Sequence, residues 1–128
     1  MKLLTRNKIT IAVLVALAVF LGVRQYRSHM LCLARKDSLR KLVEGLTDDA
    51  RGQLRPGTNK AGVVRFFQDH HMQVDFGYGI ASGSFVTSGC APFGCGADTA
   101  IVGVSVKVNG DGMVVSEPQV SGMFNDCM

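Results

Sequence analysis

The sequence predicts an α+β fold, with a single N-terminal transmembrane helix followed by one or two short helices packed on a three- or four-stranded antiparallel sheet. Three observations predict it. An uncharged apolar run fills residues 9–23, apolar residues recur at helical spacing between 37 and 71, and from residue 72 the apolar period falls to two. Helices that precede a run of strands are typical of the α+β class.

The chain divides into four expected segments. These are a basic tail at 1–8, a transmembrane signal-anchor helix at 9–23, a basic juxtamembrane linker at 24–36 and a small α+β domain at 37–128. About a hundred residues follow the anchor, enough for one small domain.

The apolar run is short for a membrane span. Its fifteen residues, Ile9–Val23, give a helix of roughly 22 Å against a hydrocarbon core of roughly 30 Å. Lys8 and Arg24 flank it and can reach the headgroup layer with long side chains, which lengthens the span. We therefore expect an uncleaved anchor. A cleaved signal peptide, a lipoprotein attached at Cys32 and a buried helix are the alternatives.

Charge is distributed unevenly along the chain. Residues 1–41 hold nine Lys and Arg and one acid, whereas residues 42–128 hold five Lys and Arg and nine acids. Seven bases are predicted to lie near anionic lipid, at about 1 kcal/mol each: Lys8, Arg24, Arg27, Arg35, Lys36, Arg40 and Lys41. Membrane lipid is thus an expected partner. Nucleic acid is not, because the domain itself is acidic and has no nucleic-acid-binding motif.

Two features of the sequence predict opposite orientations in the membrane. Three basic residues precede the apolar run and six follow it, which favours a cytoplasmic domain. The four cysteines and the short basic tail favour the opposite side. We expect an inner (plasma) membrane protein with its domain facing the periplasm or exterior.

Two helices are predicted before the strands. Asp37-Ser38 would cap a first helix over 39–46, with continuity between this helix and the anchor as the alternative, and Thr47-Asp48-Asp49 would start another turn. After a turn at 55–57, Thr58 or Asn59 would cap a helix over 60–71. Its apolar face is formed by Val63, Val64 and Phe67, and it ends in His70 and His71.

The strands are predicted from alternation. Residues 74–81 read as one half-buried strand whose glycine-rich face lies under another element. A further strand is expected around Phe85-Val86. The clearest hairpin signal joins apolar runs at 102–108 and 113–120 through Asn109-Gly110-Asp111-Gly112, and Pro118 places the returning strand at a sheet edge.

The cysteines are the residues most able to carry chemistry. The disulfide candidates are Cys90, Cys95, Cys32 and Cys127, and an even number of cysteines beyond a membrane anchor indicates an oxidising compartment. Cys90 and Cys95 are the favoured local pair because the turn between them contains Pro and Gly, although all three connectivities stay open. The alternatives are unpaired cysteines and a redox or metal site, which lacks the usual spacing.

The remaining candidates give weaker signals. His70 and His71 are adjacent on a helix and diverge by about 100°, so they do not chelate together. The loop 109–112 lacks the final acid of a calcium site. Ser84 and Ser88 lie in no nucleophile motif. An apolar cluster of Phe85, Phe93 and Phe124 is expected to serve packing more than partner binding. No catalytic residue, metal or cofactor is expected.

Two resemblances concern short features. Residues Pro56–Val63 resemble the start of the small lipoprotein domain of the outer-membrane β-barrel assembly machinery, but the lipobox is missing. An apolar helix before a sheet with a disulfide is similar to type IV pilins, but the glycine cleavage site and the glutamate within the helix are missing. Neither resemblance implies a function for this chain.

Three classes of function follow from these features. The favoured one is a non-catalytic envelope membrane protein that is structural or binds another protein. The second is a redox or metal-handling membrane protein that uses Cys90 and Cys95. The third is a lipid-interacting regulator that acts through the basic segment 24–41. The oligomeric state is not predicted.

Overall fold

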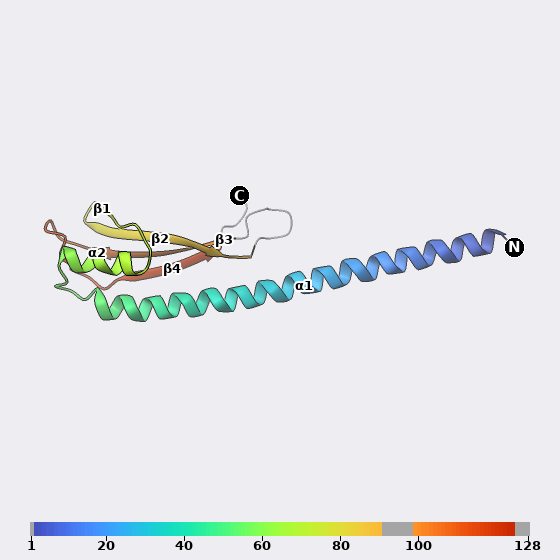
Figure 1. The fold of residues 1–128 in the computed structure, drawn as a ribbon, viewed down its shortest axis with the longest axis horizontal. Helices are drawn as coiled ribbons and strands as arrows, with labels where there is room; N and C mark the ends of the chain where they lie inside the picture. Colours follow the sequence, from blue (N-terminus) through green and yellow to red (C-terminus); the bar gives the residue numbers. More distant parts are fainter. Residues whose placement is uncertain (1, 91–98, 125–128) are drawn as a thin grey trace. The chain divides into compact units, whose positions relative to one another are not determined.

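A computed structural model of the chain describes the backbone of residues 2–90 and 99–124. In chain order the elements are α1 (Lys2–Gln53), α2 (Lys60–Asp69), β1 (Asp75–Gly77), β2 (Ile80–Ser88), β3 (Thr99–Lys107) and β4 (Gln119–Phe124) (Figure 1). The predicted α+β class is confirmed. The chain forms two compact units, Met1–Ala34 and Arg35–Met128.

Helix α1 joins the apolar run to the helix predicted over 39–46, as the alternative of a continuous helix allows. It runs without interruption from Lys2 to Gln53, so the predicted N-cap at Asp37-Ser38 and the predicted second start at Thr47 are wrong. The segment 24–36, which we assigned to a linker, contains neither Pro nor Gly and is helical. The helix ends shortly before Pro56-Gly57, where Gly57 takes a positive φ of 96°.

Helix α2 follows the sequence signals closely. Its N-cap is Asn59, whose Oδ1 accepts a hydrogen bond from the backbone N–H of Gly62 at 2.9 Å. Phe66 joins Val63 and Phe67 on the buried face, whereas the predicted face residue Val64 is only half-buried. The helix is therefore rotated slightly from its expected position on the sheet.

The sheet is a four-stranded antiparallel meander in the order β1-β2-β3-β4. The single strand predicted over 74–81 is wrong, because Tyr78 and Gly79 form a two-residue turn between β1 and β2. Their φ angles are 53° and 74°, and positive φ at both central positions is the turn geometry that fits the twist of a hairpin. The alternation of apolar residues continues through Tyr78 and Gly79, so the sequence pattern does not show that a turn lies there.

The connection from β3 to β4 begins with the predicted turn. Val108 forms a bridge with Val114, and the Asn109 Oδ1 accepts hydrogen bonds from the backbone N–H groups of Asp111 and Met113 at 3.0 and 2.9 Å. The regular strand starts later than predicted, at Gln119, directly after Pro118. β4 is an edge strand, as the proline indicated.

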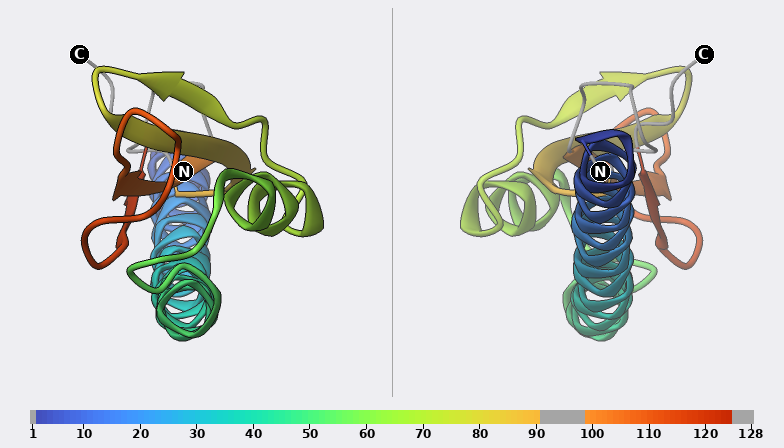
Figure 2. Two further views of the ribbon diagram at one scale, coloured as in Figure 1. Left: turned by 90° about the vertical axis from the view of Figure 1, so that its left-hand side faces the viewer. Right: turned by 90° about the vertical axis from the view of Figure 1, so that its right-hand side faces the viewer.

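The core of the second unit lies between one face of the sheet and two helices, α2 and the end of α1 (Figure 2). From α1 the buried side chains recur at helical spacing, at Leu39, Leu46 and Ala50, and Leu54 directly after the helix is buried too. From β3 they alternate: Ala100, Val102, Val104 and Val106. Two glycines of the inner face make the close approach possible, because a Cβ on Gly83 would lie 2.6 Å from Phe67 Cδ1 and one on Gly122 would lie 2.7 Å from Val43 Cγ2.

Candidate functional site

The apolar run of α1 is fully exposed in the structure. Among the described residues α1 is the one helix long and apolar enough to cross a membrane by length and composition, and none of its most apolar window is buried. Large apolar side chains such as Leu14 and Phe20 are 63% and 65% exposed. A contiguous exposed apolar surface of this kind marks a candidate site of contact with lipid or with another protein.

The seven predicted lipid-facing bases differ in their surroundings. Lys8, Arg24 and Arg27 are exposed in the first unit. In the second unit, Arg35 donates from Nη1 to the carbonyl oxygen of Gly89 at 2.8 Å. Lys36 is exposed there.

Arg40 and Lys41 both pair with Asp37. The Arg40 Nη2 and the Lys41 Nζ lie 2.7 and 2.8 Å from the two carboxylate oxygens of Asp37. The hydrogen bond and the charge of Lys41 do most to lower the pKa of Asp37, desolvation opposes them, and the hydrogen bond and charge of Arg40 lower the pKa further. Three bases of this segment, Arg35, Arg40 and Lys41, therefore make contacts within the protein.

Cys32 on α1 and Cys90 directly after β2 are both disulfide-bonded. The structure leaves no cysteine free among the residues that it describes. Cys95 and Cys127 lie outside the described ranges, so the pairing of Cys90 with Cys95 stays a prediction. Oxidised cysteines are the chemistry of an oxidising compartment.

His70, His71 and the loop 109–112 make contacts that belong to the fold. The ring of His70 lies 4.6 Å from that of Phe66, centroid to centroid, and His71 takes a positive φ of 57° at the end of α2. Asn109 directs its oxygen at backbone N–H groups of its own turn. Within residues 7–90 and 99–124, no three His, Cys, Asp or Glu side chains are grouped so that they could hold a metal ion.

The phenylalanines that we expected to cluster serve the core. Phe85 and Phe124 are half-buried and pack against the buried residues, as the packing interpretation predicts. Phe93 lies outside the described residues.

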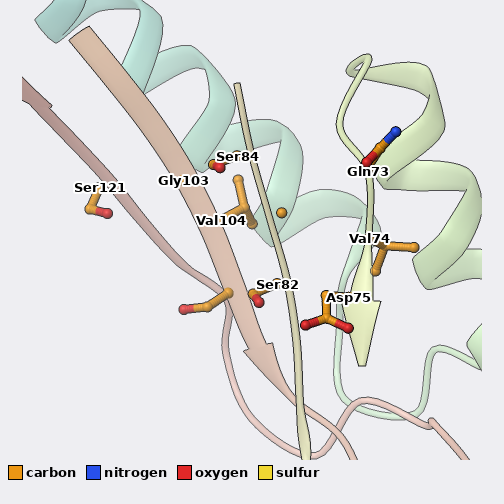
Figure 3. A pocket seen from close by; sticks show the side chains of 10 residues that line it. Gln73, Val74, Asp75, Ser82, Ser84, Gly103, Val104 and Ser121 are labelled. Carbon is orange, nitrogen blue, oxygen red and sulfur yellow. The ribbon is translucent and has the colours of Figure 1, made fainter. Parts of the chain in front are cut away.

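The face of the sheet opposite the helices carries a broad polar hollow of about 710 Å³. Small side chains line it: Ser82, Ser84, Gly103, Ser105 and Ser121. Figure 3 shows Asp75 beside Ser82, its partner in the β1–β2 register, with Ser121 on the far strand. These groups can exchange hydrogen bonds with a polar surface. The carboxylate beside these serines is that of Asp75, and no histidine is among the described residues that line the hollow.

One end of this face carries an apolar row. Val86, Ile101 and Met123 are partners in consecutive registers, so they lie side by side across β2, β3 and β4. Their exposed fractions are 66%, 37% and 61%. The alternation of β3 could have located Ile101, because its neighbours at 100 and 102 point into the core. The other two were missed since the register was unknown.

A second hollow, of about 550 Å³, lies between the helices and β2. Four apolar and four ionisable or polar residues line it: Leu42, Leu46, Phe85 and Val86, and Asp49, Asp69, His70 and His71. We call it the β2 groove. The Nε2 of His70 is buried and has no hydrogen-bond partner among the described residues. No signal in the sequence predicts this groove, because it joins three separate elements.

No protein family, curated protein or solved structure matches this chain in the comparisons.

Proposed function

We propose that this chain is a single-pass membrane protein of a bacterial-type envelope, and that its domain is a structural or protein-binding module without catalytic activity. One observation carries the proposal. α1 is a continuous helix whose apolar stretch is exposed, while its last third supplies buried residues to the folded domain. A folded domain on an exposed apolar helix is the arrangement of an anchored protein.

The domain offers surfaces suited to a partner. The exposed row of Val86, Ile101 and Met123 is an apolar strip on a polar sheet face, and such contiguous strips commonly mark interaction sites. This supports protein binding in preference to a purely structural role.

Membrane anchoring is tested by carbonate extraction of the full chain expressed in cells. The unaltered protein should stay in the membrane pellet. Leu14→Arg combined with Leu17→Arg should move it to the soluble fraction, because each arginine at mid-membrane costs about 3 kcal/mol. Leu14→Ile with Leu17→Ile is the matched control and should stay in the pellet. Release of the unaltered protein by carbonate would contradict the proposal.

We place the domain on the periplasmic or exterior side, a choice supported by the oxidised cysteines. A membrane-impermeant thiol reagent tests it in intact cells, before and after reduction. Labelling that appears only after reduction supports both the orientation and the disulfides. Labelling that requires broken cells would place the domain in the cytoplasm.

A further inference from the structure

Strand β2 has an edge that is covered only in part. β1 pairs with Ile80 through Ser82, whereas β2 continues to Ser88. The carbonyl oxygen of Gln73 lies beside Gly83, where it would be 2.7 Å from an added Cβ. In the part of the chain that the structure describes, no strand pairs with β2 on this side from Ser84 onward. We call Ser84–Ser88 the open edge.

The direction of the backbone groups follows from the β1–β2 turn. Gly77 and Ile80 flank a two-residue turn and form its hydrogen-bonded pair, so both backbone groups of Ile80 point toward β1. This direction recurs at every second residue. Ser84, Val86 and Ser88 therefore point their N–H and C=O groups out of the open edge, and all three are exposed. Unpaired groups in a row are a template for another strand.

The β2 groove lies next to the open edge and can hold a side chain of a strand added there. Its apolar wall contains Leu42, Leu46 and Phe85, and its volume of about 550 Å³ suits one or two large side chains. Successive side chains of a strand point to opposite faces. A strand added at the open edge would direct one side chain into the groove and the next onto the open face, beside the exposed Val86.

Charge indicates what the added strand should carry. Asp49 and Asp69 line the groove, and residues 42–128 carry a net charge of −4. A lysine or arginine beside the apolar anchor would face these carboxylates.

We propose that the open edge Ser84–Ser88 and the β2 groove bind an extended segment of a partner protein by strand addition. The segment places a large apolar side chain in the groove and a basic side chain near Asp49 and Asp69. Main-chain hydrogen bonds to Ser84, Val86 and Ser88 supply affinity, and the groove supplies specificity. This inference rests on the proposed protein-binding function and names the class of partner.

The test begins with selection of random peptides on the full chain in lipid nanodiscs. Enriched peptides should show apolar residues at every second position and a nearby Lys or Arg. Apolar residues at helical spacing would overturn the proposal. A failure to enrich any peptide would also overturn the proposal. That outcome includes a chain that self-associates through this edge and a chain that binds only lipid.

The strongest selected peptide then serves as the probe for the hydrogen bonds. Synthetic versions carry N-methyl groups on alternate residues, in one register or in the other. Methylation in the register that faces β2 removes donors and blocks approach, so binding should weaken tenfold or more, while the other register should bind normally. Equal binding by both versions would overturn strand addition.

Variants of the protein provide the matching evidence. Ser84→Pro removes an edge-facing N–H that no described strand pairs with, so it should weaken peptide binding about tenfold, whereas Ser84→Ala should bind like the unaltered protein. Unaltered binding by Ser84→Pro would contradict the proposal. If that variant misfolds, the N-methylated peptides still decide. The Leu14→Arg, Leu17→Arg chain separates the two proposals, because it tests anchoring and leaves the edge intact.

Discussion

Substitution of Gly83 by alanine should destabilise the domain more than any comparable change of a glycine in the sheet. The added methyl group would lie 2.6 and 2.9 Å from Phe67 Cδ1 and Cε1 and 2.7 Å from the carbonyl oxygen of Gln73. Phe67 is completely buried, and the carbonyl belongs to the backbone. Neither neighbour can rotate away, so we expect a cost near the upper end of the roughly 1–3 kcal/mol range for overpacking.

Two other glycines provide a graded comparison. In Gly122→Ala the close atom is Val43 Cγ2, at 2.7 Å, on a half-buried side chain that can shift, so the cost should be nearer about 1 kcal/mol. Gly45 lies within α1 with nothing within 4 Å of its added Cβ. Gly45→Ala should therefore stabilise the helix by roughly 0.5–1 kcal/mol.

Pulse proteolysis in urea, on the full chain in detergent micelles, measures the three effects. With a urea dependence of about 1–3 kcal/mol per molar, Gly83→Ala should lower the unfolding midpoint by about 1 M or more. The expected order of stability is Gly45→Ala, unaltered protein, Gly122→Ala, Gly83→Ala. A midpoint for Gly83→Ala at or above that of Gly122→Ala would refute the packing argument.

Three further predictions concern local features. Asn59→Ala should cost about 1 kcal/mol in the same assay because it removes the N-cap of α2, whereas Thr58→Ala should cost less; equal losses would contradict the assigned cap. Tyr78→Asn should leave the urea midpoint unchanged or raise it, because asparagine tolerates the φ of 53° better than tyrosine; a clear loss would show that the tyrosine ring matters more than the turn. Lys41 and Arg40 lower the pKa of Asp37, so their pairing with the ionised carboxylate stabilises α1 at any pH above the ordinary carboxyl pKa of about 3.9. This contribution is lost as the pH falls through the lowered pKa. Melting curves of the unaltered protein and Asp37→Asn should differ at pH 7 and converge in strong acid; a constant difference would contradict the assignment.

Most of the elements could be predicted from local patterns. The capped helix at 60–69, the strand over 99–107 and the edge position after Pro118 follow from capping, alternation and the missing proline N–H, which act within a few residues. The apolar run could be located for the same reason, since its length and lack of charge are properties of the chain itself. These features need no knowledge of distant contacts.

The errors arose where a local pattern had two solutions. Alternation over 74–81 fits one strand or two strands joined at Tyr78-Gly79, and only pairing of Asp75 with Ser82 decides between them. We also assigned the close-approach role to glycines 77 and 79. In the structure Gly83 and Gly122 have that role, because they face Phe67 and Val43 across the core.

The sequence alone determined the uncharged apolar run, the acidic balance of residues 42–128 and the α+β class, since hydropathy, charge and periodicity are local properties. Tertiary structure alone decided the register that aligns Val86 with Ile101 and Met123, the open edge beyond Ser82 and the groove beneath it. Such surfaces depend on which elements pack together and on where β1 stops. Pairwise contacts between residues distant in the chain set both, and no local pattern encodes them.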